Sequence, residues 1–175
     1  MTQGRGFKMA TSEKPNGSQS KLLILVAVIV VIVIVGLFLV LRSPETAADA
    51  VRELPDQTLR IETAAGEEIE LTVKNASLFE GKTSGFNDVD ADVVNTTVLF
   101  VSTAFSATSV IEVRDLKAPI EIAFFTAEGD FMEMHRFSEG ASEEFAPTGR
   151  YMHLLEARAG FFEEQGIGEG SSLLL

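Results

Sequence analysis

The stretch IEIAFFTAEGDFMEMHRF, residues 120–137, is the part of the chain that most clearly specifies a fold. Residues 120–126 are rich in branched and aromatic side chains, which favour a strand. The turn formers Glu128, Gly129 and Asp130 follow, and residues 131–137 predict the returning strand. This pair predicts a β-sheet with antiparallel neighbours.

Similar short runs lie on both sides of this hairpin. Apolar and polar residues alternate over 59–61 and 69–73, which predicts a second strand pair that turns at Ala65-Gly66. Further strands are predicted over 96–101, 110–113, 153–157 and 172–175, and a short helix over 160–166. The predicted fold class is all-β, a mostly antiparallel sandwich or barrel with one or two short helices, occupying residues 57–175. Its core is predicted to hold Phe100, Ile122, Phe124, Leu155 and Phe161.

A second block, LLILVAVIVVIVIVGLFLVL at residues 22–41, contains no charged or polar side chain. Twenty apolar residues suffice for a helix to cross a bilayer core of about 30 Å. The sequence therefore predicts one transmembrane helix before the β domain, with the lipid bilayer as partner through Leu22 to Leu41. Residues 1–21 would be a disordered tail and residues 42–56 a linker.

The charges around this block predict its direction. The tail has four basic residues and one acidic one, whereas 10 basic and 25 acidic residues follow the block. Because basic flanks stay in the cytoplasm, we expect a single-pass cell-membrane protein with a cytoplasmic N-terminus and an external domain. A signal peptide cleaved near Ala48-Asp49-Ala50 is the alternative, although its apolar region would be unusually long.

Composition excludes some classes of function. The chain has no cysteine, so disulfides, thiol catalysis and cysteine-ligated metals are excluded. Its net charge of −12 argues against nucleic acid as a partner, since binding to phosphates needs Lys and Arg. No cofactor motif was found, and no cofactor is predicted.

Four blocks, in order, resemble the family known as domain of unknown function 192. Residues 118–129 (APIEIAFFTAEG) are similar to the family's string IPLDIAFIDADG, and residues 154–161 (LLEARAGF) to VLEVNAGF. Residues 98–101 (VLFV) and the glycine-flanked residues 166–170 resemble two further blocks. The resemblance covers residues 68–175 and implies a compact, sandwich-like β domain of a kind often exported or anchored. The family has no agreed activity.

The best candidate polar cluster follows from a departure from that family. Its distinctive string FWMKNT is replaced here by residues 111–116, IEVRDL, which keep only a cation and a short polar residue at Arg114-Asp115. With Glu121, these residues could hold an anionic or sugar-like ligand, because Arg offers a planar fork of donors. The alternative is a structural ion pair.

Two other patterns are weaker. Asp88, Asp90 and Asp92 alternate as in a calcium loop, but the glycine and glutamate that such a loop needs are absent, which favours a solvated acidic loop. His135 and His153 lie on predicted strands and would need a carboxylate to hold a metal, so no metal site is predicted.

The sequence thus predicts a binding or interaction module for an unknown small polar ligand or protein. The alternative is a hydrolase-like enzyme, which would need a deep cleft where Arg114, Asp115 and a histidine converge.

Overall fold

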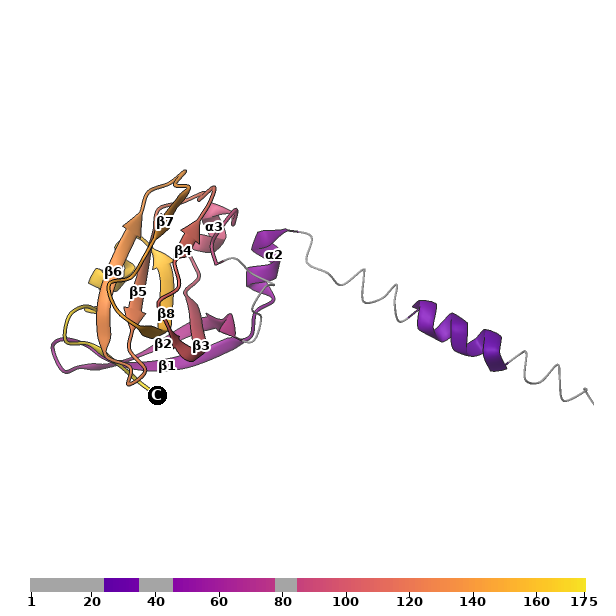
Figure 1. The fold of residues 1–175 in the computed structure, drawn as a ribbon, viewed down its shortest axis with the longest axis horizontal. Helices are drawn as coiled ribbons and strands as arrows, with labels where there is room; N and C mark the ends of the chain where they lie inside the picture. The colour runs from indigo at the N-terminus through magenta and orange to yellow at the C-terminus, as the bar shows by residue number, and fades with distance from the viewer. Residues whose placement is uncertain (1–23, 35–45, 78–84) are drawn as a thin grey trace, which may run out of the picture. The chain divides into compact units, whose positions relative to one another are not determined.

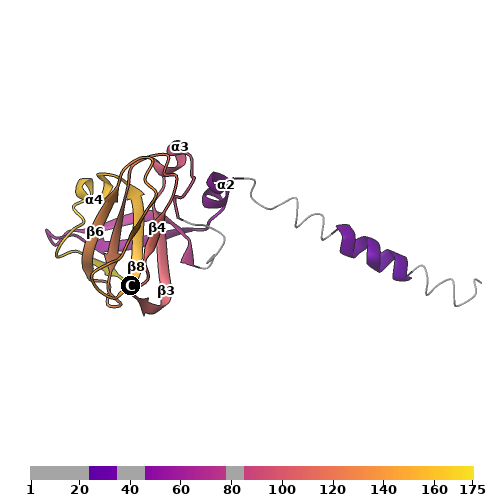
Figure 2. The same ribbon diagram turned by 45° about the horizontal axis from the view of Figure 1, so that its top comes forward.

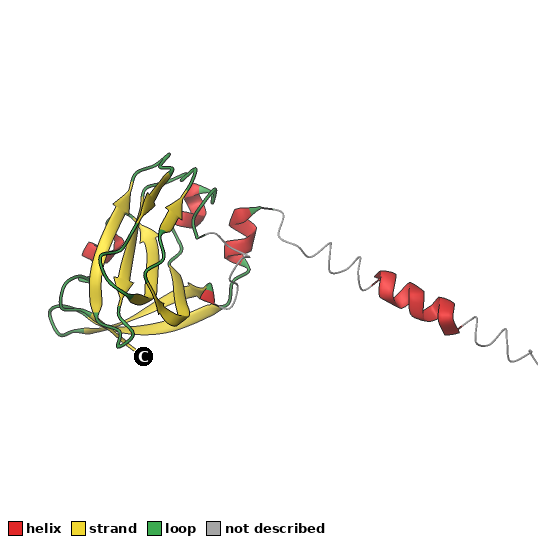
Figure 3. Ribbon diagram, in the orientation of Figure 1, coloured by secondary structure: helices red, strands yellow, loops and turns green. Residues whose placement is uncertain are grey.

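The computed structural model describes residues 24–34, 46–77 and 85–175, and within β3 it leaves the side chains of residues 104–106 undescribed. The chain divides into two units, Met1–Ser43 and Pro44–Leu175. In the second unit, strands predominate and the helices are short, as Figure 3 shows by colour. The prediction of a mostly β domain is therefore confirmed.

The prediction of a transmembrane helix over residues 22–41 is wrong. In the first unit the described helix covers residues 24–34, which at about 1.5 Å per residue spans only about 16 Å of a bilayer core of about 30 Å. Among the described residues, no helix combines the length and the apolar character needed to cross a membrane. The predictions of a bilayer-spanning Leu22–Leu41, of a single-pass cell-membrane location and of a cytoplasmic N-terminus are therefore overturned. The tail 1–21 and residues 22–23 and 35–41 of that block lie outside the described residues.

Seven strands form the main sheet of the second unit, in the order β6-β5-β8-β3-β2-β1-β9. Their bounds are β1 Asp56–Glu62, β2 Glu68–Asn75, β3 Leu99–Ala107, β5 Ile120–Phe125, β6 Phe131–Phe137, β8 Tyr151–Arg158 and β9 Ser172–Leu174. Neighbouring strands are antiparallel except for the short parallel contact of β2 with β3. The two predicted hairpins, β1–β2 and β5–β6, are both present.

The sheet curls until its two ends nearly meet. Figure 1 shows β1 and β2 running across one end of β5, β6 and β8, and in Figure 2 the magenta strands of this hairpin cross the direction of β6 and β8. Between the outer strands, the Phe131 N–H donates to the Ser171 carbonyl at 2.9 Å, and the Leu173 N–H donates to the Gly129 carbonyl at 2.8 Å. The main sheet is therefore a curled half-barrel whose two outer edges meet along a short seam.

A smaller antiparallel ribbon accompanies the sheet. It pairs β4, Ile111–Val113, with β7, Glu143–Phe145. β7 lies within residues 138–149, where no apolar run or alternation predicts a strand, since EEF offers only one apolar side chain.

β5 is buried along its whole length because apolar clusters cover both of its faces. Ile120, Ile122 and Phe124 face an outer cluster, and Ala123 and Phe125 face the cluster inside the curled sheet. A strand covered on both faces reads as a continuous apolar run, which explains the sequence IEIAFF. Of the five predicted core residues, Phe161 is only partly buried, because Phe162 on the next position of the short helix α4, Phe161–Glu164, points into the core.

The predicted linker 42–56 also contributes to the core. It contains α2, Ala47–Arg52, whose N-terminus is capped when the Thr46 hydroxyl accepts a hydrogen bond from the Asp49 N–H at 3.1 Å. Val51 of α2 and Leu54 just after it are buried in the outer cluster, near the helix α3, Ala91–Val94. The folded unit therefore begins at about Pro44.

Candidate functional site

A pocket of about 310 Å³ lies between the main sheet and the ribbon strand β4. Its floor is formed by β5 and β8, and its walls by β3, β4 and residues 85–87. This volume is at the lower end of the roughly 300–1,000 Å³ that small-molecule sites usually enclose. The pocket can therefore hold a small organic molecule.

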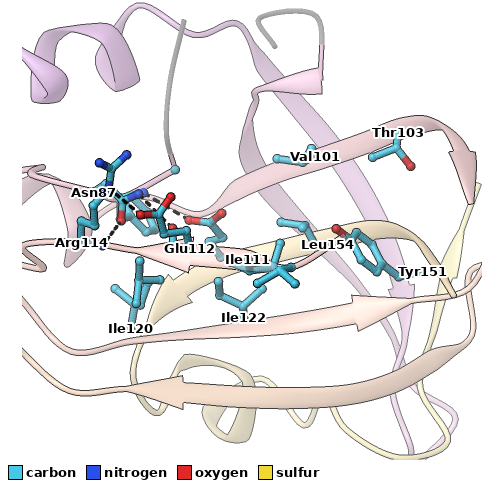
Figure 4. Close-up of a pocket in the computed structure, with 15 residues that line it drawn as sticks. Asn87, Val101, Thr103, Ile111, Glu112, Arg114, Ile120, Ile122, Tyr151 and Leu154 are labelled. Carbon is cyan, nitrogen blue, oxygen red and sulfur yellow. Dashed lines mark hydrogen bonds and ion pairs between the residues drawn. The ribbon is translucent and has the colours of Figure 1, made fainter. Parts of the chain in front are cut away.

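The pocket has a polar end and an apolar end. In Figure 4, Asn87, Glu112 and Arg114 gather at one end, and Tyr151 lies at the other. Ile111, Ile122 and Leu154 also line the pocket. The polar atoms at the Tyr151 end bond within the protein: the Thr103 hydroxyl donates to the Met152 carbonyl at 3.2 Å, and the Tyr151 hydroxyl to the Ser109 carbonyl at 3.4 Å. That end consequently offers mainly apolar surface.

Glu156 on β8 is the buried acid of this pocket, with 8% of its surface exposed. Its Oε2 accepts a hydrogen bond from the Phe86 N–H at 3.2 Å, so the carboxyl lies near Asn87 and the polar end. Within the described part of the chain this is its only hydrogen bond, which leaves Oε1 without a donor. Burial raises the pKa of the Glu156 carboxyl to about 7, and the Phe86 bond opposes this shift.

Gly85 allows the backbone to pass close to this carboxyl. A Cβ atom at residue 85 would lie 2.5 Å from Glu156 Oε2 and 2.7 Å from Oε1, closer than atoms can approach. The residue also has a φ of +65°, which a side chain disfavours. Glycine is therefore favoured here by its backbone conformation, and a larger residue would also have to displace the Glu156 carboxyl.

Asn87 connects the wall of residues 85–87 to the end of β4. Its Oδ1 accepts from the Arg114 N–H at 2.7 Å, and its Nδ2 donates to the Glu112 carbonyl at 3.1 Å. Arg114, the first of the predicted site residues, lines the pocket and forms an exposed ion pair with Glu112, 3.3 Å between Nε and Oε1.

Asp115, the second predicted residue, lies outside the lining of this pocket. It lines a separate surface hollow together with Arg114, Asp88 and Ala47. Its backbone has a φ of +50°, and its N–H donates to the Ser142 hydroxyl at 3.2 Å. Asp115 thus forms the turn that follows β4.

Glu121, the third predicted residue, belongs to a different part of the fold. It is fully buried, and it accepts hydrogen bonds from the Gly160 and Phe162 N–H groups at 2.9 and 2.8 Å and from Arg136 Nη2 at 2.9 Å. These bonds hold the start of α4 against the sheet. Arg114 and Asp115 are adjacent in the chain and line the same surface hollow. Glu121 lies elsewhere in the fold and does not contribute to it.

The histidines do not line the pocket. His153 is buried and stacks on Phe100 at 5.9 Å between ring centroids, and burial lowers the pKa of its imidazole. His135 stacks on Phe145 at 4.1 Å. The convergence of Arg114, Asp115 and a histidine that a hydrolase would need is thus not observed in the described pocket.

The alternating aspartates do not form a calcium loop either. Asp88 pairs with Lys117 at 2.9 Å, and Asp92 pairs with Arg52 at 3.1 Å. Among the residues that the structure describes, no group of three or more His, Asp or Glu side chains could hold a metal ion.

Sequence reasoning missed Glu156 and Gly85. The one signal for Glu156 is its place in the strand LLEA, where a carboxylate interrupts an otherwise apolar run. A charged residue on a strand that is buried on both faces needs a hydrogen-bonding or oppositely charged partner, or it has a functional role. Nothing local connects it with Gly85, because the two meet only through the tertiary fold.

The curled sheet and this pocket define a small β domain with a half-enclosed site between its main sheet and a separate ribbon. No family model matches the chain, and no curated protein matches it, so the resemblance to domain of unknown function 192 stays a prediction. The fold is similar to the crystal structure of a proposed transcription regulator from Sinorhizobium meliloti, with a TM-score of 0.59 and 18% identity over 69% of this chain and 93% of that one.

A second similar structure is a protein of unknown function from Novosphingobium aromaticivorans. Its TM-score is 0.55, with 15% identity over 71% of this chain and 89% of that one. At these identities the likeness concerns the fold alone.

Proposed function

We propose that residues 44–175 form a small-molecule binding module whose ligand has an apolar body and a polar head. The apolar body would lie along Ile111, Ile122 and Leu154, and the head would meet Glu156 at the polar end of the pocket. The observation that carries the proposal is Glu156 itself, a buried carboxyl in the pocket lining whose Oε2 accepts one hydrogen bond and whose Oε1 accepts none from the described residues.

Buried polar groups in proteins nearly always have hydrogen-bond partners, because burial without a partner is unfavourable by several kcal/mol. A group that lacks one inside a ligand-sized pocket is therefore a candidate for contact with a ligand. Arg114 is proposed to border the ligand at the rim, where its guanidinium stays paired with the Glu112 carboxylate and so adds no net charge beside the head group.

A binding module is favoured over a hydrolase because the pocket lining provides a single buried acid and neither histidine. General acid–base hydrolysis commonly uses a pair of groups with different pKa values. The fold similarity to a proposed transcription regulator is not extended to DNA binding here, because a chain with a net charge of −12 has little to offer phosphates.

The test is a fragment screen by thermal shift and ligand-observed NMR on the full chain, with a pocket-blocking variant. Val110 lines the pocket and is 51% exposed, so Val110→Trp should fill the pocket without disturbing the core. Met134→Trp is the matched control, since Met134 is an exposed apolar residue on β6 outside the pocket lining. Fragments should bind the wild type and Met134→Trp but not Val110→Trp. Binding that Val110→Trp leaves unchanged, or no binding by any fragment, would contradict the proposal.

A further inference from the structure

We infer that the head group which this pocket accepts is a cationic amine, held by the Glu156 carboxylate with the apolar part of the ligand toward Tyr151. The inference rests on the proposed function and narrows its ligand to a chemical class. Three features of the described residues carry it: the balance of charges in the pocket, the free acceptor atom, and the steric frame around the carboxyl.

Among the described residues that line the pocket, the charges leave one acid without a counter-charge. Three carboxylate or guanidinium groups line it, from Glu112, Arg114 and Glu156. Arg114 and Glu112 pair with each other at 3.3 Å at the rim, where both are more than half exposed. The buried Glu156 carboxyl has no cation beside it among the described residues, so a positive ligand group would complete a neutral site.

The hydrogen-bonding capacity of the Glu156 carboxyl also favours a cationic head group. Phe86 supplies one N–H to Oε2, and Oε1 has no donor within the described chain. An ammonium carries three donors and no acceptor, which matches a site whose unused capacity is that of an acceptor. Above about pH 7, where Glu156 is ionised, a carboxylate or phosphate head would instead place acceptor against acceptor and like charge against like charge.

The neighbouring residues Gly85 and Phe86 hold the Glu156 carboxyl in place in the absence of a ligand. Gly85 lies so close that any larger residue would collide with the carboxyl, and the Phe86 N–H fixes one oxygen. The desolvation of this acid is therefore already present in the folded protein and is not added when a ligand binds. Because the pKa of Glu156 is raised to about 7, its proton is readily released near neutral pH to an amine of higher pKa.

The experiment compares three probes of nearly the same shape: phenethylamine, phenethyl alcohol and phenylacetate. Each is titrated by calorimetry into the full chain, into Glu156→Gln and into Glu128→Gln. Glu156→Gln keeps the size of the side chain and an oxygen for the Phe86 N–H. Glu128→Gln removes one negative charge from an exposed turn and controls for the net charge of the protein.

We expect phenethylamine to bind the wild type and Glu128→Gln about tenfold or more tightly than phenethyl alcohol, and phenylacetate not to bind. In Glu156→Gln the preference for the amine over the alcohol should disappear. Suppose that amine and alcohol bind the wild type equally while Val110→Trp abolishes the binding of both. That result would support the proposed binding pocket and contradict the inference of a cationic head group. If an amine preference persists in Glu156→Gln, the inference also fails. If no probe binds and the fragment screen also finds no ligand, both the proposed binding function and the inference of a cationic head group are contradicted.

Discussion

Gly85 and Glu156 are in direct contact across the pocket wall: a methyl group at position 85 would lie 2.5 Å from the Glu156 carboxyl oxygen. The contact joins a residue in an irregular segment to the strand β8, which lies between β5 and β3 in the main sheet. Any side chain at position 85 would have to displace the acid that we assign to the ligand.

This relationship predicts that Gly85→Ala destabilises the protein by two separable effects. The φ of +65° alone should lower the free energy of unfolding by roughly 1–3 kcal/mol, and the collision with Glu156 adds to it. In a Glu156→Ala background only the backbone effect should remain. Urea denaturation of the wild type, both single variants and the double variant measures the coupling. Equal losses from Gly85→Ala in both backgrounds would show that the two residues do not interact.

The raised pKa of Glu156 predicts that stability falls as pH rises. The folded protein holds this proton up to about pH 7, whereas the unfolded chain releases it near pH 4.5. The contribution of Glu156 is therefore fully present below about pH 4.5 and is lost as pH rises through 7. The loss is roughly 3 kcal/mol in total.

Glu156→Gln should remove this part of the pH dependence. Chemical denaturation between pH 4.5 and 8 should give a flatter curve for the variant and a higher stability than the wild type at pH 8. Parallel curves for the two proteins would mean that the Glu156 carboxyl is not desolvated.

The bonds of Glu121 predict a structural role rather than binding. Glu121→Ala would leave the Gly160 and Phe162 N–H groups without their acceptor and Arg136 without its partner. We expect the free energy of unfolding to fall by roughly 3–5 kcal/mol. Probe affinity measured below the unfolding transition should not change. The exposed Glu128→Ala is the control, with an expected change within about 0.5 kcal/mol.

The burial of α2 predicts where a soluble fragment must begin. A fragment starting at Leu54 lacks Val51, which is fully buried in the outer cluster, and Ala48 beside it. Burial of a valine contributes roughly 1.5–3 kcal/mol, so this fragment should melt clearly below one starting at Pro44. Differential scanning calorimetry of the two fragments makes the comparison. Identical melting temperatures would show that α2 does not contribute to the core.

Arg114 and Asp115, although adjacent, should respond differently to substitution. Arg114→Ala removes only an exposed ion pair and should change the free energy of unfolding by less than about 1 kcal/mol. Asp115→Val places a branched side chain at a φ of +50° and should lower it by roughly 1–3 kcal/mol, whereas Asp115→Asn should be nearly neutral. Thermal denaturation distinguishes them, and a large loss from Arg114→Ala would show that its guanidinium is a structural clamp.

The strands of the domain could be predicted from sequence because their information is local. The alternation at 59–73 and the apolar run at 120–125 each specify a strand that the structure contains. β7 and α2 could not, because each depends on a tertiary partner: β7 on its pairing with β4, and α2 on the outer cluster. The apolar block at 22–41 shows the opposite error, since its composition predicts a longer helix than the one described at 24–34.

The candidate site was predictable only in part. Arg114 was found because it stands where a distinctive string of a resembled family would lie, and it does line the pocket. Glu121 was included because it is near in sequence, but successive residues of a strand face opposite sides, and position 121 faces α4. Glu156 and Gly85 could be identified as site residues only from the tertiary structure, in which they come into contact.

The position of β8 between β3 and β5 has a consequence for the order of folding events. The hairpins β1–β2 and β5–β6 can form from neighbouring residues, but along the sheet they are connected through β3 and through residues 151–158, which pair with both β3 and β5. The contacts that unite the sheet therefore have large sequence separations, as in the β-proteins that fold in milliseconds to seconds. Glu156 lies in this joining strand, so the pocket is completed in the same step that completes the sheet.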